Sequence, residues 1–214
     1  GSGKSTLGRS ILRLVPMTGG QISFDGIELS ALEGRSLKQF RHRMQMIFQD
    51  PYASLNPRMT VYDTLAEPLL LHGLVNKAGL EQAIRELMDN VGLARAFVRK
   101  YPHEFSGGQR QRIAIGRALA TRPEFIVADE PVSALDVTIQ AQILDLLADL
   151  TKEYGLTMLF ISHDLAVIRQ IADRIAVMYL GKLVEEGATA QVFETPQQDY
   201  TRSLLDAIPG ANAA

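Results

Sequence analysis

The chain has 214 residues, which is enough for one well-packed domain or for one domain with an inserted lobe. Its 22 basic and 24 acidic residues leave a net charge of −2, so no overall positive field attracts nucleic acid, and nucleic acid is not an expected partner. The absence of cysteine excludes disulfides and cysteine-based metal sites. No apolar run approaches the roughly 20 residues that span a bilayer.

The first fifty residues alternate between helical and extended patterns. An Asp25-Gly26 pair between two short apolar runs indicates a tight hairpin. The elements predicted here are a helix at Leu7–Leu14 ended by Pro16, hairpin strands at Gln21–Phe24 and Ile27–Leu29, a polar helix at Ser36–Arg43 and a strand at Met44–Phe48.

The next stretch has only helical patterns, and we predict a helical insertion over about residues 50–122. Thr60 begins one helix, with Asp63 three positions later as an approximate capping box. Within Glu81–Val91, apolar residues recur at helical spacing. Tyr101-Pro102 ends this part of the helical pattern.

Strands and helices alternate again after the insertion. Such alternation predicts an α/β fold with a mostly parallel sheet that is covered by helices on both faces. The predicted elements are strands at Phe125–Ala128, Leu156–Ile161 and Ile175–Tyr179, and helices at Val137–Tyr154, Leu165–Asp173, Ala188–Phe193 and Tyr200–Ala207.

The sequence Gly-Ser-Gly-Lys-Ser-Thr at Gly1–Thr6 lies directly before the first predicted helix. Glycines allow backbone N–H groups to approach phosphates, and a helix N-terminus adds partial positive charge. Lys4 can reach phosphate oxygens and the Ser5 hydroxyl can bind Mg²⁺. Taken alone, the same residues are equally consistent with a flexible linker.

The predicted strand Phe125–Ala128 runs into two carboxylates, Asp129 and Glu130. Side chains alternate along a strand, so these two point in different directions. One can hold Mg²⁺ or its waters while the other orients an attacking water. The simpler alternative is a pair of solvated acids at the entry to a loop.

A Phe-Ser-Gly-Gly-Gln sequence at Phe105–Gln109 precedes another predicted helix. With it, the whole chain resembles the ATPase subunits of ABC transporters, which implies a P-loop NTPase fold with an inserted helical subdomain. The family's motifs occur in order as the end of the Walker A loop at Gly1–Thr6, the Q-loop Gln49, the signature motif Ser106–Gln109, the Walker B strand Phe125–Glu130, the D-loop Ser133–Asp136 and the switch His163.

The resemblance implies ATP and Mg²⁺ as ligands and assigns a role to each matching residue. The residues implied to hold the phosphates are Gly1, Ser2, Gly3, Lys4, Ser5 and Thr6. Those implied to contact ATP from the opposite subunit are Ser106, Gly107, Gly108 and Gln109. The implied metal ligands are Ser5, Gln49 and Asp129, the implied catalytic residues are Glu130, His163 and Lys4, and Asp136 is implied to communicate across the dimer.

Three of these motifs also have a structural interpretation. Ser106 can cap the helix that follows it, and Ser-Gly-Gly is frequent in loops. Gln49 can simply end a strand, and His163 can cap the helix at Leu165. The order of the motifs and the placement of each on its expected element favour the functional interpretation.

Two segments resemble one subgroup in particular, the importers of oligopeptides and dipeptides, which also include glutathione and nickel importers. They are Phe48–Arg58 and Tyr101–Phe105, with support from Asp129–Ser133 and the tail Pro196–Pro209. The resemblance implies a second ATPase subunit, identical or different, and transmembrane permease subunits as partners, with a solute-binding protein acting indirectly. It implies a peripheral location at the cytoplasmic face of the inner membrane.

The first glycine of the Walker A pattern would precede Gly1, together with a strand and an aromatic residue that stacks on adenine. We therefore expect a chain that begins inside this loop, binds ATP weakly, and gains both stability and affinity when the upstream residues are restored. Two alternatives to a transport ATPase stay open: an ABC ATPase of DNA repair or translation, and an inactive fragment.

Overall fold

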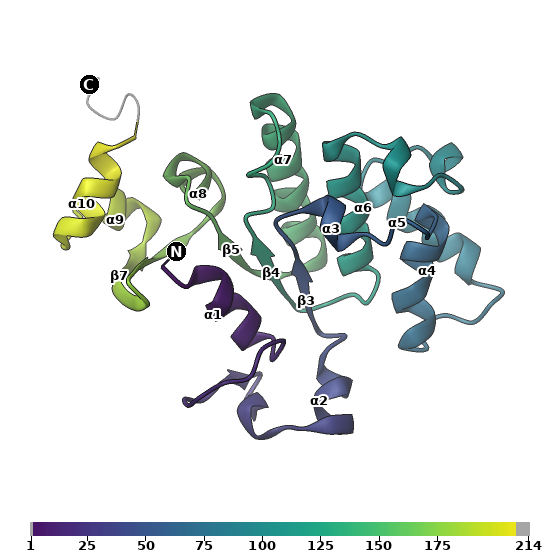
Figure 1. The fold of residues 1–214 in the computed structure, drawn as a ribbon, viewed down its shortest axis with the longest axis horizontal. Helices are drawn as coiled ribbons and strands as arrows, with labels where there is room; N and C mark the ends of the chain where they lie inside the picture. Colours follow the sequence, from purple (N-terminus) through teal and green to yellow (C-terminus); the bar gives the residue numbers. More distant parts are fainter. Residues whose placement is uncertain (1, 209–214) are drawn as a thin grey trace.

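The computed structural model describes residues 2–208. A parallel sheet of three strands lies at the centre, in the order β3–β4–β5 (Figure 1). β3 (Met44–Ile47) pairs with β4 (Phe125–Asp129) from Met44 opposite Phe125. β4 pairs with β5 (Thr157–Ile161) from Phe125 opposite Thr157. Within residues 2–208, no strand pairs with the second edge of β5, and the upstream strand expected from the resemblance stays a prediction.

The central strand β4 is buried on both faces, as its continuous apolar sequence predicts. Val127 belongs to a small cluster on one face, with Leu12 and Ile161. Its neighbours Ile126 and Ala128 belong to the main core on the other face. The short helix α1 (Lys4–Ile11) contacts β4 and β5.

Only helices separate β3 from β4 in the chain. The bounds of these helices are Pro51–Ser54 for α3, Val61–Leu71 for α4, Leu80–Asn90 for α5 and Gly107–Leu119 for α6, with short 3-10 turns at Arg95–Phe97 and Pro102–Glu104. The predicted capping box begins α4, because the Thr60 hydroxyl accepts from the Asp63 amide and the Asp63 carboxylate accepts from the Thr60 amide.

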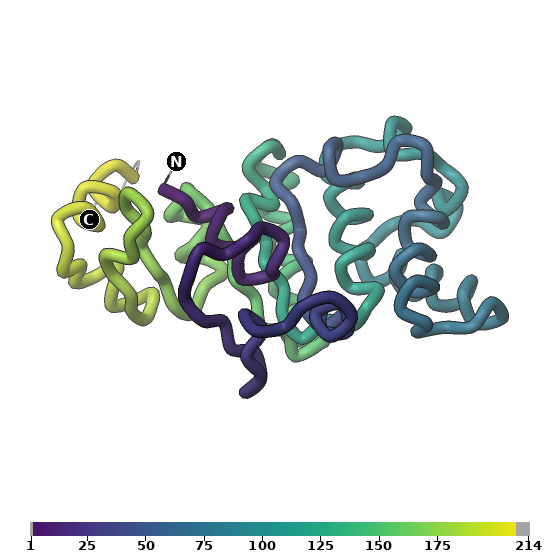
Figure 2. Tube along the Cα trace, turned by 60° about the horizontal axis from the view of Figure 1, so that its bottom comes forward, coloured from purple at the N-terminus to yellow at the C-terminus, as the bar shows by residue number. Residues whose placement is uncertain are grey.

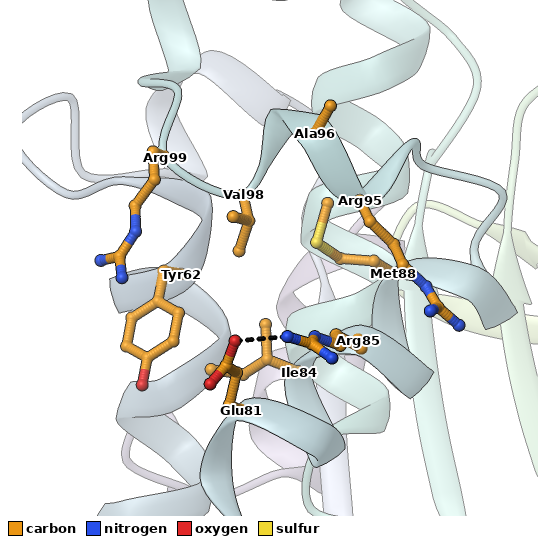
Figure 3. Close-up of a pocket in the computed structure, with 9 residues that line it drawn as sticks. All are labelled: Tyr62, Glu81, Ile84, Arg85, Met88, Arg95, Ala96, Val98 and Arg99. Atoms are coloured by element: carbon orange, nitrogen blue, oxygen red, sulfur yellow. Dashed lines mark hydrogen bonds and ion pairs between the residues drawn. The ribbon is translucent and has the colours of Figure 1, made fainter.

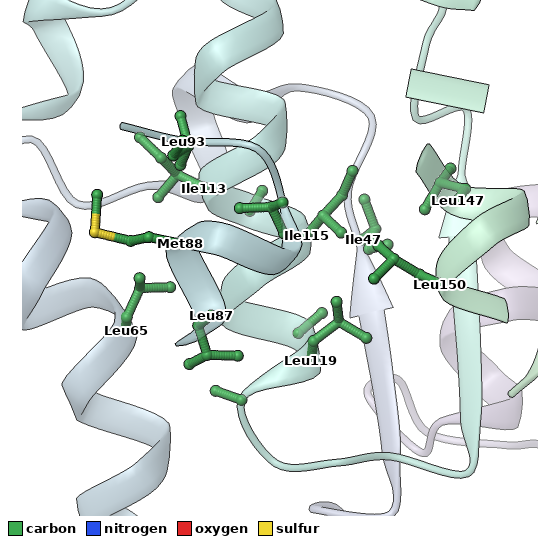
Figure 4. Packing of buried hydrophobic residues seen from close by; sticks show 14 of the residues in the cluster. Ile47, Leu65, Leu87, Met88, Leu93, Ile113, Ile115, Leu119, Leu147 and Leu150 are labelled. Atoms are coloured by element: carbon green, nitrogen blue, oxygen red, sulfur yellow. The ribbon is translucent and has the colours of Figure 1, made fainter. Parts of the chain in front are cut away.

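One hydrophobic core joins these helices to the sheet. Helix α6 is at the middle of this core and contributes Ile113, Ile115 and Leu119 (Figure 4). On one side these residues meet α4 and α5, and on the other side they meet β3 and α7 (Val137–Tyr154). All three are less than 3% exposed. The helical segment therefore shares its packing with the sheet.

The remaining elements flank the sheet. The hairpin of β1 (Ser23–Phe24) and β2 (Ile27–Glu28) turns at Asp25 and Gly26, both with positive φ, as the Asp-Gly pair predicts. It is followed by a 3-10 turn at Leu29–Ala31 and by α2 (Gly34–Phe40). The predicted helix at Leu7–Leu14 begins earlier, at Lys4, and ends at Ile11, because Arg13 adopts a left-handed backbone before Pro16 is reached.

The C-terminal part differs from the sequence prediction. The predicted strand at Ile175–Tyr179 is present as β6 (Arg174–Tyr179), but it pairs antiparallel with β7 (Lys182–Ala188) and not with the parallel sheet. The sequence prediction lacked β7 because its Leu-Val-Glu-Glu-Gly-Ala run does not alternate apolar and polar residues. The turn uses Leu180 and Gly181, both with positive φ.

Short helices complete the C-terminal part: α8 (Leu165–Ile171), α9 (Thr189–Glu194) and α10 (Asp199–Asp206). Ala188, predicted as helical, is the last residue of β7. The β6–β7 hairpin and α9–α10 lie at one end of the molecule and the helices between β3 and β4 at the other (Figure 2). Among the described residues, no helix has both the length and the apolarity to cross a membrane.

Candidate nucleotide site

The N-terminus of α1 provides a place for an anion. Gly3 precedes the helix with φ +89°, a left-handed conformation that glycine adopts at little cost. Lys4 is the first helical residue, and its Nζ donates to the Ser2 hydroxyl over 3.1 Å. The first turn of α1 itself carries no acidic side chain. Gly1 lies outside the described residues.

Gly8 sets how closely α1 approaches the sheet. A Cβ atom at Gly8 would lie 2.9 Å from both Ile161 Cδ1 and Val127 Cγ1, so a side chain there would require the helix or these two side chains to shift. The close packing holds α1 against β4 and β5.

A hydroxyl–carboxylate pair joins α1 to the end of β4. The Ser5 Oγ donates to Asp129 Oδ1 over 2.7 Å, and Arg9 lies 3.9 Å from the second carboxylate oxygen. Asp129 is only 1% exposed, and a buried carboxylate requires such partners. Arg9 was not among the predicted site residues, although its position four residues after Ser5 places it on the same helix face.

A second cluster surrounds Glu130, the residue after β4. Gln49 Nε2 donates to Glu130 Oε2 over 3.0 Å, and His163 Nδ1 lies 3.2 Å from Glu130 Oε1. The histidine side chain is 66% exposed and the glutamate 16%, so the carboxylate lies beneath the ring at an open surface. Asp129 and Glu130 therefore point to different partners, in agreement with the sequence interpretation.

The three strands of the sheet explain why these residues meet. Gln49 follows β3, Glu130 follows β4 and His163 follows β5, and the carboxyl ends of parallel strands meet at one edge of a sheet. Residues more than thirty positions apart in sequence are thereby brought within hydrogen-bonding distance. Gln49 contacts Glu130 and not Asp129 in this arrangement, so its role as a metal ligand stays a prediction.

The predicted signature residues lie at the N-terminus of α6. Ser106 and Gln109 form a capping box with each other, which confirms the capping role expected for Ser106. Gly107 faces Leu135, and a Cβ at Gly108 would lie 2.5 Å from Ile139 Cγ2, so Gly108 is also needed for packing against α7. Within residues 2–208, no hydrogen bond or ion pair joins these four residues to Lys4 or Glu130.

The N-termini of α7 and α8 show where the predicted residues Asp136 and His163 lie. Asp136 caps α7 by accepting from the Ile139 amide over 3.1 Å. Asp164 caps α8 by accepting from the amides of Ala166 and Val167, so the alternative that His163 caps this helix is wrong. His163 is left with its ring toward Glu130.

Two cavities in the described part of the chain lie away from this site. One, of about 390 Å³, lies among α4, α5 and the turn after α5 (Figure 3). It is lined by Tyr62, Glu81, Ile84, Arg85, Met88, Arg95, Ala96, Val98 and Arg99. The other, of about 380 Å³, lies between α2 and the end of α4. Neither of these two cavities contains a predicted site residue.

The residues present suit a magnesium nucleotide. In the described chain, no group of three or more His, Cys, Asp or Glu residues is placed to hold a metal ion. Mg²⁺ at phosphate-binding sites needs only one or two protein oxygens, because the phosphates and water supply the rest. The Ser5 hydroxyl and the Asp129 carboxylate already lie together beside the helix terminus.

A parallel α/β sheet with a glycine–lysine–serine helix start and carboxylates at the strand ends defines a P-loop nucleotide-binding protein. The family model described as "ABC transporter" matches residues 1–133. The chain is 56% identical, over 98% of its length, to an oligopeptide transport ATP-binding protein of Bacillus subtilis. It is 52% identical, over 99% of its length, to a glutathione import ATP-binding protein of Pectobacterium atrosepticum. The chain therefore belongs to the ABC transporter ATP-binding family.

Solved structures agree with this assignment. A dimeric ATP-binding cassette in a post-hydrolysis state with ADP and Pi matches 88% of the chain with a TM-score of 0.78 and 32% identity, over 81% of that protein. A cassette of a Clostridium perfringens ABC transporter complex matches 97% of the chain with a TM-score of 0.79 and 25% identity, over 80% of that protein. The chain spans 69% of the length of the oligopeptide relative and 34% of the glutathione relative. It spans 66% of a putative peptide import ATP-binding protein of Brucella ovis, to which it is 54% identical over 98% of its own length.

Proposed function

We propose that the protein containing this chain hydrolyses ATP to drive the import of peptides or similar small solutes. The observation that carries the proposal is the convergence of Gln49 and His163 on the Glu130 carboxylate, beside the Ser5–Asp129 pair. The Ser5–Asp129 pair is suited to holding the metal ion of a magnesium nucleotide, and the cluster around Glu130 is suited to activating water.

In this proposal, Lys4 and the amides at the start of α1 bind the phosphates. Ser5, Gln49 and Asp129 would hold Mg²⁺, which when bound neutralises charge that develops on the phosphate oxygens. Glu130 orients and polarises the attacking water, and its carboxylate accepts a proton from it. His163, on an exposed loop beside Glu130, contacts the terminal phosphate and holds the carboxylate in place.

The Glu130 carboxylate is already engaged by both neighbours in the structure. Gln49 and His163 would exchange part of these contacts for contacts to the nucleotide when it binds. Binding and activation are thereby linked through the same two side chains. The site would then have two states, one with Gln49 and His163 on Glu130 and one with both on the nucleotide. ATP would favour the second state, as a ligand-driven switch requires.

The relatives named as oligopeptide and glutathione transport proteins support the importer part of the proposal. Permease subunits and a second ATPase subunit are the proposed partners, and the helical segment over about residues 50–122 is proposed to transmit motion to the permease. The dimeric cassette among the related structures supports the pairing of two ATPase subunits. In the proposed dimer the subunits pair head to tail, and Ser106–Gln109 contacts ATP on the second subunit.

Proteoliposomes with the full-length protein and its permease partners test this function. MgATP inside the vesicles should drive uptake of labelled peptides only when the solute-binding protein is present. The Lys4→Ala variant should lose ATP binding and uptake together. Hydrolysis that instead responds to ribosomes or DNA, and not to the permease, would favour the ABC ATPases of translation or repair.

A further inference from the structure

The backbone of Glu130 is in a conformation that a glutamate rarely adopts. Its φ is +47°, in the left-handed region, at the step between β4 and the turn that follows. For a non-glycine residue this conformation is less stable than the right-handed one, because its Cβ lies too close to the following carbonyl oxygen. It persists only where surrounding contacts hold it, and such residues cluster at functional sites.

Both peptide groups of Glu130 are held. On the strand side, the Glu130 amide donates to the Ile161 carbonyl of β5 over 2.8 Å. On the turn side, the Glu130 carbonyl accepts two bonds from Ser133, one from its amide over 3.3 Å and one from its hydroxyl over 3.1 Å. The Ser133 side chain is exposed, and this is its one hydrogen bond among the described residues.

The left-handed backbone decides where the carboxylate lies. Asp129, still in the strand, directs its side chain to Ser5, and the conformational break at Glu130 directs the next carboxylate to Gln49 and His163. A backbone that relaxed out of this region would swing the carboxylate away from both partners. Reactions that depend on a positioned base lose rate steeply for small displacements.

We infer that Ser133 is a positioning residue, whose hydroxyl holds the strained backbone of Glu130 and thereby aims its carboxylate. The inference rests on the proposed role of Glu130 as the group that activates water. Because Ser133 acts through the Glu130 carbonyl, its loss should lower kcat without weakening ATP binding. The Ser133 amide still bonds the same carbonyl in a variant without the hydroxyl, so the loss is partial.

The test compares Ser133→Ala, Ser133→Thr and Ser203→Ala in the full-length protein. Ser203 is the matched control, because its hydroxyl also donates to a backbone carbonyl, that of Asp199 over 3.0 Å, on the distant helix α10. Loss of one hydrogen bond predicts that Ser133→Ala lowers kcat roughly 3- to 10-fold with KM for ATP unchanged. Ser133→Thr should restore kcat, and Ser203→Ala should change neither constant.

A Glu130→Gln variant separates this inference from the function on which it rests. If Glu130→Gln is inactive while Ser133→Ala keeps full kcat, the positioning role is wrong. A fall in kcat that threonine does not restore, or that appears only as lost folded protein in thermal unfolding, also overturns it. Full activity in Glu130→Gln would instead contradict the proposed function of Glu130.

Discussion

At the scale of single residues, the predicted site is distributed over two clusters with different chemistry. Ser5 and Asp129 bond directly, and Gln49 and His163 both contact Glu130. All five residues are among those that the family resemblance implies, and their roles stay predictions. The left-handed backbone of Glu130 and the contact between Gly108 and Ile139 could not be predicted, because they depend on how distant segments pack.

Gly108 is expected to have a structural role in addition to its implied contact with ATP. In Gly108→Ala the new Cβ would meet the branched methyl of Ile139, whose χ1 rotation is restricted in a helix, so unfolding by urea should show a loss of roughly 1–3 kcal/mol.

Two further variants locate the cause. Gly107→Ala is the matched control, because its Cβ would meet only the flexible end of Leu135 at 3.2 Å. Ile139→Leu removes the offending branch and should reduce the cost of Gly108→Ala. Equal costs for Gly108→Ala in both backgrounds would show that this contact does not require the glycine.

At the scale of elements, periodic segments were predicted well and unpatterned ones were not. The helix at Val137–Tyr154 has the predicted bounds, because its apolar residues recur at helical spacing over five turns. β7 was not predicted, and β6 was placed in the wrong sheet. Strand pairing is set by contacts between segments, and the sequence of β6 carries no information about its partner.

The contact between α2 and the end of α4 should make stability depend on pH. The pKa of His72 lies below its usual value of 6.5, first because of burial and then because of the nearby positive charges of His42 and Lys38. Below pH 6.5 the unfolded chain therefore binds more protons at this site than the folded chain does. The contribution of His72 to stability is fully present above pH 6.5 and is lost as the pH falls through the lowered pKa.

Urea unfolding between pH 7.5 and 5 measures this dependence. His72→Gln should remove part of the fall in unfolding free energy at acidic pH, and His42→Gln should remove a smaller part. The rings of these two histidines lie 5.7 Å apart. An unchanged pH profile in His72→Gln would contradict the assignment.

At the scale of the whole molecule, the helical segment and the sheet share one core. Ile115, with no exposed surface, lies on α6 among residues from both parts (Figure 4). The helical insertion was expected from the sequence, whereas the continuity of its core with the sheet was not, because periodicity shows which face of a helix is buried and not against what it packs.

Because the core is shared, we predict that the helical segment and the sheet unfold in a single cooperative transition. A substitution in this core should lower the stability of both parts together. Ile115→Ala should cost roughly 2–5 kcal/mol by denaturant titration, with the helical and aromatic signals shifting together. Val137→Ala, at a side chain that is 81% exposed, should change stability by less than about 0.5 kcal/mol. Two separated transitions in the Ile115 variant would show that the helical segment folds independently.

In the proposed mechanism, the Ser5–Asp129 cluster binds the magnesium nucleotide and the Glu130 cluster activates water. This mechanism is tested most directly by measuring ATP binding and phosphate release in parallel for Glu130→Gln in the full-length protein. Because the carboxylate is expected to act on water and not on the nucleotide, MgATP affinity should stay close to that of the wild type. Phosphate release should fall by roughly 10²- to 10⁴-fold. A variant that binds MgATP and still releases phosphate at the wild-type rate would contradict the account.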